Sequence, residues 1–108
     1  FLESSIGKRV KSADINGKLH TEQPFVLGEE IGGEISLVQG IIDVYFEEDG
    51  ELVVLDYKTD KVKEACELVE RYRVQLDYYA KALEQVSKKK VKEKIIYSFT
   101  LKEEIEVW

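Results

Sequence analysis

Residues 40–59 have the sequence GIIDVYFEEDGELVVLDYKT, in which two apolar runs flank an acidic turn. The runs cover residues 41–48 and 51–57, and both are rich in β-branched and aromatic side chains, a composition that favours strands. Asp49-Gly50 stands between them and is a strong signal for a two-residue type I′ turn. This stretch therefore predicts an antiparallel hairpin.

The length of the turn decides which residues face each other. With a two-residue loop, Glu48 pairs with Glu51. Counting outward from that pair brings Asp43 opposite Asp56, and directly opposite residues share one face of a sheet with Cβ atoms about 4.5–5.5 Å apart. Lys58 lies two residues beyond Asp56 and points to the same face. The hairpin thus predicts a patch with two carboxylates and one ammonium.

This register depends on the number of residues in the loop. A four-residue loop leaves it unchanged, whereas a three- or five-residue loop shifts it by one residue and puts the aspartates on opposite faces. The apolar pattern favours the first case, because the face away from the aspartates then becomes an almost wholly apolar core face. That face holds Ile42, Val44, Phe46, Val53, Leu55 and Tyr57. The aspartate face is mixed, and it holds Ile41, Tyr45 and Val54 beside the charges.

The paired aspartates need a compensating charge. Like charges directly opposite each other destabilise a sheet, and Asp43 and Asp56 lie inside apolar runs rather than in turns. The alternative is that they are ordinary polar residues at strand ends. A cation, a proton or Lys58 would offset the repulsion. Hard divalent cations prefer oxygen ligands, and a nearby lysine can assist an attacking water. The patch therefore predicts a metal-dependent hydrolase.

Composition limits the remaining possibilities. The chain has 108 residues, of which 44% are hydrophobic and 35% charged, as expected for one globular domain. No apolar run has the length of a membrane span, so we expect no membrane partner. Cys66 is the single cysteine, which excludes a disulfide framework and fits a reducing cytosol; we interpret it as a small core residue. The net charge of −6 indicates that any DNA is held mainly by other parts of a larger protein, or that the chain binds none.

Hydrophobic periodicity and turn residues predict the order helix, three strands, helix, two strands. We expect Pro24 to mark an edge strand or a bulge, Gly40 a bulge or close backbone approach, and Asp60 the N-cap of the second helix. The expected helices cover residues 1–12 and 62–86, and the expected strands outside the hairpin cover residues 19–27, 34–39, 94–101 and 104–108.

Three segments in this order resemble a known family. They are Gly40-Ile41-Ile42-Asp43, Asp56-Tyr57-Lys58-Thr59 and Gln75-Leu76-Asp77-Tyr78-Tyr79. The chain resembles the RecB-type branch of the PD-(D/E)xK nuclease superfamily, and most of all the C-terminal nuclease domain of AddA-type helicase–nuclease subunits. The resemblance implies an α/β, restriction-endonuclease-like fold: a mixed β-sheet with a central antiparallel hairpin flanked by helices. Residues 1–108 would form a single nuclease domain, a C-terminal fragment of a longer protein.

The resemblance also implies roles for individual residues. Asp43 and Asp56 would bind the metal together with the backbone carbonyl of Tyr57, and Lys58 would position the attacking water and stabilise charge on the phosphate. Gln75 and Tyr79 match a helical motif of the catalytic site and lie four residues apart, so they share one helix face. Packing alone would also explain Tyr79. The cofactor would be Mg²⁺, with Mn²⁺ as a substitute.

In this family, a histidine on an upstream helix also binds the metal, and we expect the chain to begin after that helix. His20 lies in a predicted strand, does not match the motif, and is interpreted as a surface residue. The sequence therefore does not decide whether the isolated chain is active. For the lysines of residues 88–94, a contact with a DNA backbone and a solvated helix end both remain possible.

The implied function is that of a metal-dependent deoxyribonuclease, an exonuclease domain of an ATP-dependent helicase–nuclease in double-strand break repair and recombination. Its partners would be DNA, the helicase portion of the same chain and a second helicase–nuclease subunit, in the bacterial cytoplasm. No nucleotide-binding G-x-x-x-x-G-K-[ST] loop occurs in these residues, so ATP would bind elsewhere. Two alternatives are a catalytically silent scaffold that binds DNA or a partner, and a metallo-phosphohydrolase of another substrate class. The paired aspartates argue against the scaffold, and the Gln75/Tyr79 motif argues for the nuclease only through the resemblance.

Overall fold

The computed structural model describes residues 1 and 3–107. Within these residues, the chain forms two helices and five strands in the predicted order. They are α1 (Ser5–Ile15), β1 (Leu19–Ile31), β2 (Glu34–Glu48), β3 (Glu51–Lys58), α2 (Ala65–Ser87), β4 (Val91–Ser98) and β5 (Glu103–Val107). Leu2 and Trp108, expected in the first helix and the last strand, lie outside the described residues. Among the residues described, neither helix is long and apolar enough to cross a membrane.

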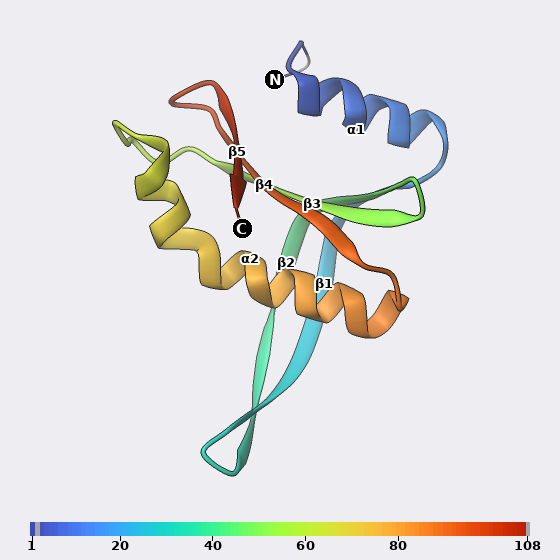
Figure 1. Cartoon of the computed structure of the whole chain (residues 1–108), viewed down its shortest axis with the longest axis vertical. Coiled ribbons are helices and arrows are strands. Elements are labelled where there is room, and N and C mark those ends of the chain that lie inside the picture. The colour runs from blue at the N-terminus through green and yellow to red at the C-terminus, as the bar shows by residue number, and fades with distance from the viewer. Residues whose placement is uncertain (2, 108) are drawn as a thin grey trace.

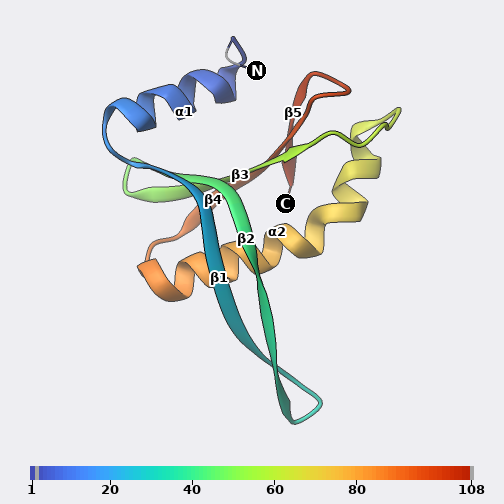
Figure 2. The same cartoon turned by 180° about the vertical axis from the view of Figure 1, so that it is seen from behind.

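The strands of the sheet lie side by side in chain order, from β1 to β5. Neighbours are antiparallel except β3 and β4, which are parallel. A turn can join antiparallel neighbours, whereas a parallel pair needs a longer crossover, and α2 provides it. Figure 1 shows α2 crossing the sheet, and Figure 2 shows the same arrangement from behind, with α1 beyond the opposite face. The predicted mixed sheet with a central hairpin and flanking helices is confirmed.

The β2–β3 hairpin has the predicted register. Glu48 pairs with Glu51 and Tyr45 pairs with Val54. Asp49 and Gly50, which form the turn, both have positive φ angles, 55° and 79°, as a type I′ turn requires. The ladder ends at the pair Val44–Leu55, one position before the two aspartates.

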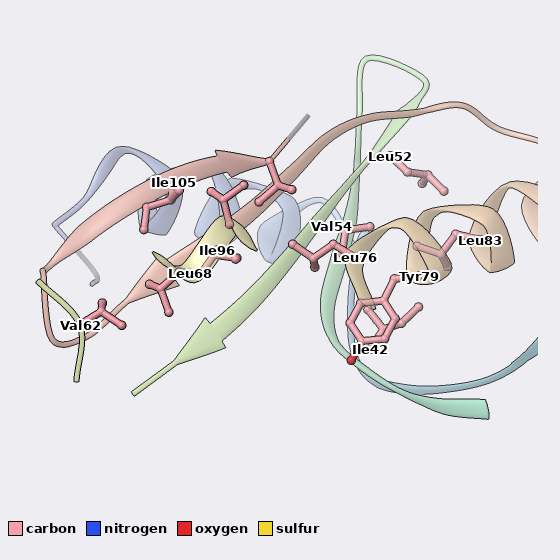
Figure 3. Close-up of a cluster of buried hydrophobic side chains, with 12 residues drawn as sticks. Ile42, Leu52, Val54, Val62, Leu68, Leu76, Tyr79, Leu83, Ile96 and Ile105 are labelled. Atoms are coloured by element: carbon pink, nitrogen blue, oxygen red, sulfur yellow. The ribbon is translucent and has the colours of Figure 1, made fainter. Parts of the chain in front are cut away.

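Two apolar layers hold the helices against the sheet, because successive β3 residues point to opposite faces. Leu52 and Val54 face α2, whereas Val53 and Leu55 face α1. Figure 3 shows the layer beneath α2. Its buried residues are Ile42, Leu52, Val54, Val62, Leu68, Val69, Leu76, Tyr79, Leu83, Ile96, Ile105 and Val107. The layer beneath α1 consists of Ile6, Ala13, Val44, Phe46, Val53, Leu55, Ile95 and Tyr97.

Ile42 corrects one expectation from the sequence. We expected it on the same face as Val44, but it packs in the α2 layer while Val44 packs in the α1 layer. The cause is an irregularity where β1 and β2 pass the site. The Glu22–Asp43 pair is missing from the ladder, and Glu22 has φ 49°. Strict alternation fails across such a kink, so Asp43 lies at a bend of β2.

The start of α2 corrects two further expectations. The helix begins at Ala65, and its N-cap is Glu64, which forms a capping box with Glu67. Asp60 is therefore not the cap; its carboxylate accepts hydrogen bonds from α2 side chains instead. Cys66 is exposed on the first turn rather than packed in the core.

Beyond the kink, β1 and β2 continue as a two-stranded arm that reaches past α2 (Figure 1). The predicted strand ended at residue 27, but β1 runs to Ile31 because pairing with β2 overrides the low strand preference of glycine and glutamate. Pro24 lies in an edge strand, as predicted. Gly40 allows the predicted close approach, since a Cβ atom there would lie 3.0 Å from the Phe25 ring.

Candidate active site

The bend in β2 and the end of β3 bring the two aspartates together. Asp43 Oδ2 accepts a hydrogen bond from the backbone N–H of Tyr57 at 3.1 Å. This bond continues the connection between the strands beyond the last ladder pair, and it holds the Asp43 carboxylate against β3. Asp56 occupies the adjacent position on β3, close enough to Asp43 for that carboxyl group to affect its pKa. The two aspartate side chains therefore lie next to each other, as predicted.

Asp56 is a buried acidic group, with only 1% of its surface exposed. Burial raises its pKa to about 7, and the neighbouring Asp43 carboxyl group adds to the rise, while Lys58 opposes it. The Asp56 carboxyl group therefore retains its proton below neutral pH. Asp56 Oδ2 lies 2.8 Å from Lys58 Nζ, yet it receives no well-directed hydrogen bond from the described residues. The oxygen is thus close to a positive charge but incompletely satisfied.

Lys58 is enclosed by three groups from two elements, and its side chain is only 16% exposed. Besides Asp56 on β3, its Nζ atom donates a hydrogen bond to Gln75 Oε1 at 3.2 Å and lies 4.0 Å from the centre of the Tyr72 ring. Gln75 and Tyr72 are three residues apart on α2, so both face the lysine. The helix therefore fixes the ammonium group beside the carboxylates.

Gln75 and Tyr79 share the helix face that covers the site, as their spacing predicted. Gln75 reaches Lys58, whereas Tyr79 packs its ring against Phe25 with centroids 5.3 Å apart. Burial, followed by the negative charges of Asp56 and Asp43, raises the pKa of the Tyr79 hydroxyl to about 12. Tyr79 is thus a core residue whose hydroxyl group lies in the field of the aspartates.

A family model for the PD-(D/E)XK nuclease superfamily matches residues 7–106. The chain belongs to this superfamily. It is 37% identical to an ATP-dependent helicase/nuclease subunit of Lachnoclostridium phytofermentans, over 99% of this chain and 11% of that protein. It is 41% identical to the corresponding protein of Clostridium novyi, over 99% and 10%, and 45% identical to that of Thermoanaerobacter sp. strain X514, over 92% and 9%. The chain therefore spans about a tenth of the length of these relatives.

The solved structure of SSO0001 is similar in fold, with a TM-score of 0.64 at 19% sequence identity. The match covers 92% of this chain and 44% of that chain. At such low identity the likeness concerns the fold alone. Together with the strand order, it confirms the restriction-endonuclease-like architecture that the PD-(D/E)XK resemblance implied.

The carboxylates of this PD-(D/E)XK chain suit a divalent cation. Asp43 and Asp56 offer adjacent oxygen atoms, and the incompletely satisfied Oδ2 of Asp56 is the kind of donor that a hard cation binds. Within residues 1 and 3–107, no three His, Cys, Asp or Glu side chains gather into a complete metal site. Mg²⁺ usually takes only one or two carboxylates and completes its shell with water and substrate phosphates, so this donor set fits it.

Tyr72 is the residue near the PD-(D/E)XK site that the sequence did not single out, because its place in the apolar stripe of α2 is explained by packing alone. The sequence feature that could have identified Tyr72 is its position three residues before Gln75, which places both side chains on one helix face. Glu22 is exposed at the strand irregularity opposite Asp43. His20 is an exposed residue, as expected, and stacks on Tyr45 at 4.6 Å.

The lysine run after α2 lies apart from the aspartates and faces other acidic groups. Lys89 pairs with Glu47, and Lys92 pairs with Glu48 at 3.0 Å. Lys94, in β4, pairs with Asp77. These three lysines therefore connect strands and helix within the chain.

Proposed function

We propose that this chain is a metal-dependent DNA nuclease domain, spanning residues 1–108, of an ATP-dependent helicase–nuclease that acts in double-strand break repair and recombination. The observation that supports it best is the buried Asp56 carboxyl group, with Asp43 beside it and Lys58 Nζ at 2.8 Å. Family membership and the names of the relatives point the same way. The activity would be exonucleolytic, in the bacterial cytoplasm. Its partners would be DNA, a helicase portion and a second helicase–nuclease subunit.

Asp43, Asp56 and the backbone carbonyl of Tyr57 would hold Mg²⁺, or Mn²⁺ in its place. When bound, such an ion supplies Lewis acidity that activates a water and stabilises charge on the scissile phosphate. The ion would have to displace the proton that Asp56 retains, so its affinity should fall as the pH drops below about 7. Lys58 then donates hydrogen bonds to the attacking water or to a phosphate oxygen, and Gln75 keeps its ammonium group oriented.

A calorimetric titration tests the ion site. Mg²⁺ or Mn²⁺ is titrated into the wild-type chain, into Asp56→Ala and into Asp49→Ala, whose carboxylate is 88% exposed in the hairpin turn. We expect weak binding to the wild type and to Asp49→Ala, and none to Asp56→Ala. Equal binding to all three proteins would contradict the ion site.

A cleavage assay tests the reaction on linear single- and double-stranded DNA, with the chain alone and within a longer polypeptide that contains it. Asp56→Ala should abolish cleavage because it removes an ion ligand. Lys58→Ala should abolish cleavage while ion binding persists, because the lysine acts on water and phosphate rather than on the ion. Cleavage by Asp56→Ala at the wild-type rate would refute the nuclease assignment.

A further inference from the structure

The Tyr72 ring forms a cation–π contact with the lysine of the site. Lys58 Nζ lies 4.0 Å from the ring centre, well within the roughly 6 Å over which the face of an aromatic ring attracts a cation. The lysine is largely shielded from solvent, so the attraction is stronger than on an open surface. We propose that Tyr72 is a positioning residue, which holds the Lys58 ammonium group in its working orientation. This inference rests on the proposed nuclease function.

The need for such a residue follows from the other contacts of Lys58. Its ion pair with Asp56 uses the carboxylate that a divalent cation would also use. Once a cation neutralises that carboxylate, the ion pair weakens, and the flexible four-carbon stem of lysine loses its strongest anchor. The Tyr72 ring and the Gln75 carbonyl oxygen do not depend on the charge of Asp56. They therefore still orient the amine when the aspartates are occupied.

Asp60 fixes the orientation of the ring. The Tyr72 hydroxyl donates a hydrogen bond to Asp60 Oδ2 at 2.8 Å, and Arg71 Nη1 donates to the same oxygen at 2.9 Å. A hydrogen bond to a carboxylate polarises the phenol and makes the ring face more negative, which strengthens its attraction for a cation. The same bond raises the pKa of Tyr72, so the phenol remains a neutral donor. Asp60 thus supports Lys58 through Tyr72.

A purely structural role for Tyr72 makes different predictions. Its ring is only partly buried and packs at the margin of the α2 layer. If packing were its whole role, Tyr72→Leu would affect stability alone, and the environment of Lys58 would not change. A positioning role predicts that the side chain of Lys58 responds to loss of the ring and that Tyr72→Phe, which keeps the ring, restores it.

Nuclear magnetic resonance of the chain labelled with ¹³C-lysine reports this contact without any catalysis. The Lys58 signal is identified by its disappearance in Lys58→Arg. Protons above an aromatic ring are shifted upfield, so we expect an upfield Lys58 Hε signal in the wild type and in Tyr72→Phe. The shift should be lost in Tyr72→Leu, and in Tyr72→Met if the leucine variant does not fold. Tyr78→Leu is the matched control on the same helix, and it should leave the Lys58 signal in place. An unchanged Lys58 signal in the folded leucine or methionine variant would overturn the inference.

Cleavage kinetics in the active polypeptide provide the second readout. Tyr72→Leu should lower kcat about ten-fold with little change in KM, since one cation–π contact of a shielded lysine is lost. Tyr72→Phe should recover most of the rate, and Asp60→Asn should lie between them. If Asp56→Ala is inactive while Tyr72→Leu keeps the wild-type kcat, the positioning inference is wrong and the nuclease function stands. If Asp56→Ala retains full activity, the proposed function is wrong, and the positioning inference, which rests on it, is overturned with it.

Discussion

The carboxyl group of Asp56 has a pKa of about 7 in the folded chain, against a usual value of 3.8. Between these two values the folded state binds a proton that the unfolded state has released, so protonation stabilises the fold. This contribution is fully present below pH 3.8 and is lost as the pH rises through 7. From pH 5 to pH 8, the metal-free chain should lose on the order of 2–3 kcal/mol of unfolding free energy.

Urea unfolding at both pH values measures this loss. Asp56→Asn should remove most of the pH dependence and should be more stable than the wild type at pH 8, because it buries no charge. The other ionisable groups are the same in both proteins, so the difference between the two proteins isolates Asp56. A wild type and a variant with the same pH dependence would contradict the raised pKa.

Ligand linkage gives a second prediction for the same residue. At pH 8, Mg²⁺ should increase the unfolding free energy of the wild type, because the ion binds the ionised carboxylates of the folded state and not the separated ones of the unfolded chain. Asp56→Asn should not respond, and Asp49→Asn, altered in the exposed turn, should respond like the wild type. Thermal unfolding with and without Mg²⁺ measures the shift. An equal shift in Asp56→Asn would locate the ion elsewhere.

For individual residues, the sequence predicted those positions that follow from counting along the two strands of the hairpin. The register that sets Asp43 beside Asp56 follows from a two-residue turn and a period of two. The predicted face of Ile42 was wrong because the two-residue alternation of the strand fails at the irregularity beside Asp43. The positive φ of Glu22 marks that irregularity, and the sequence does not indicate it, because glutamate rarely adopts a positive φ. The contact between Tyr72 and Lys58 depends on how α2 crosses the sheet, which no local pattern specifies.

Among the elements, α1 is joined to the sheet by an ion cluster around Arg9. Its Nη2 atom lies 2.8 Å from Glu48 in β2 and 2.7 Å from Glu93 in β4. Hydrogen bonding to Arg9 lowers the pKa of Glu48 to about 2. Because the cluster is partly shielded, Arg9→Met should cost about 1–2 kcal/mol at pH 7. Arg9→Lys should recover only part of this loss, since lysine lacks the two-pronged geometry.

Urea unfolding at pH 7 measures these costs, with Lys11→Met, exposed on the same helix, as the control. The folded pKa of Glu48 is depressed, so its contribution is present above about pH 4.5 and is lost as the pH falls through 2. The penalty of Arg9→Met should therefore shrink in acid. A penalty independent of pH would assign Arg9 a packing role only.

The β1–β2 arm offers a matched pair of leucines on its two sides. Leu27 is 2% exposed on the side of α2, whereas Leu37 is 72% exposed. Leu27→Ala should cost about 2–4 kcal/mol because it leaves a cavity, while Leu37→Ala should stay within about 0.5 kcal/mol. Chemical denaturation of the two variants compares them directly. Similar costs would mean that the outer side of the arm is covered in solution.

Element order was predictable because strands and helices differ in period, and each turn carries glycine or a polar pair. The residues at which the elements begin and end were harder to predict. The arm extends beyond residue 27 only because β2 pairs with it, and the start of α2 depends on which acidic residue caps it. Aspartate is a preferred N-cap residue, so the sequence pointed to Asp60. The helix instead begins after Glu64, which is held by the capping box with Glu67, and Asp60 binds Tyr72.

For the whole molecule, charge distribution argues that DNA affinity lies mainly outside these residues. The net charge is −6, and residues 19–57 contain no lysine or arginine. Lys89, Lys92 and Lys94 already pair with acidic groups of the chain. Each phosphate contact by a cation makes the logarithm of affinity fall with the logarithm of salt by about 0.9. Because the chain carries a net charge of −6, we expect few such contacts and a slope no steeper than about −2.

Fluorescence anisotropy with a labelled oligonucleotide, in Ca²⁺ in place of Mg²⁺ to limit cleavage, measures this slope between low and moderate salt. We expect weak binding with a shallow slope for the isolated chain, and a steeper slope once the chain is part of a longer polypeptide. Lys92→Gln should hardly change binding to DNA but should lower stability, because its partner Glu48 loses a cation. A slope of about −5 or steeper for the isolated chain, reduced by about one in Lys92→Gln, would instead make the lysines of residues 88–94 a DNA-binding surface.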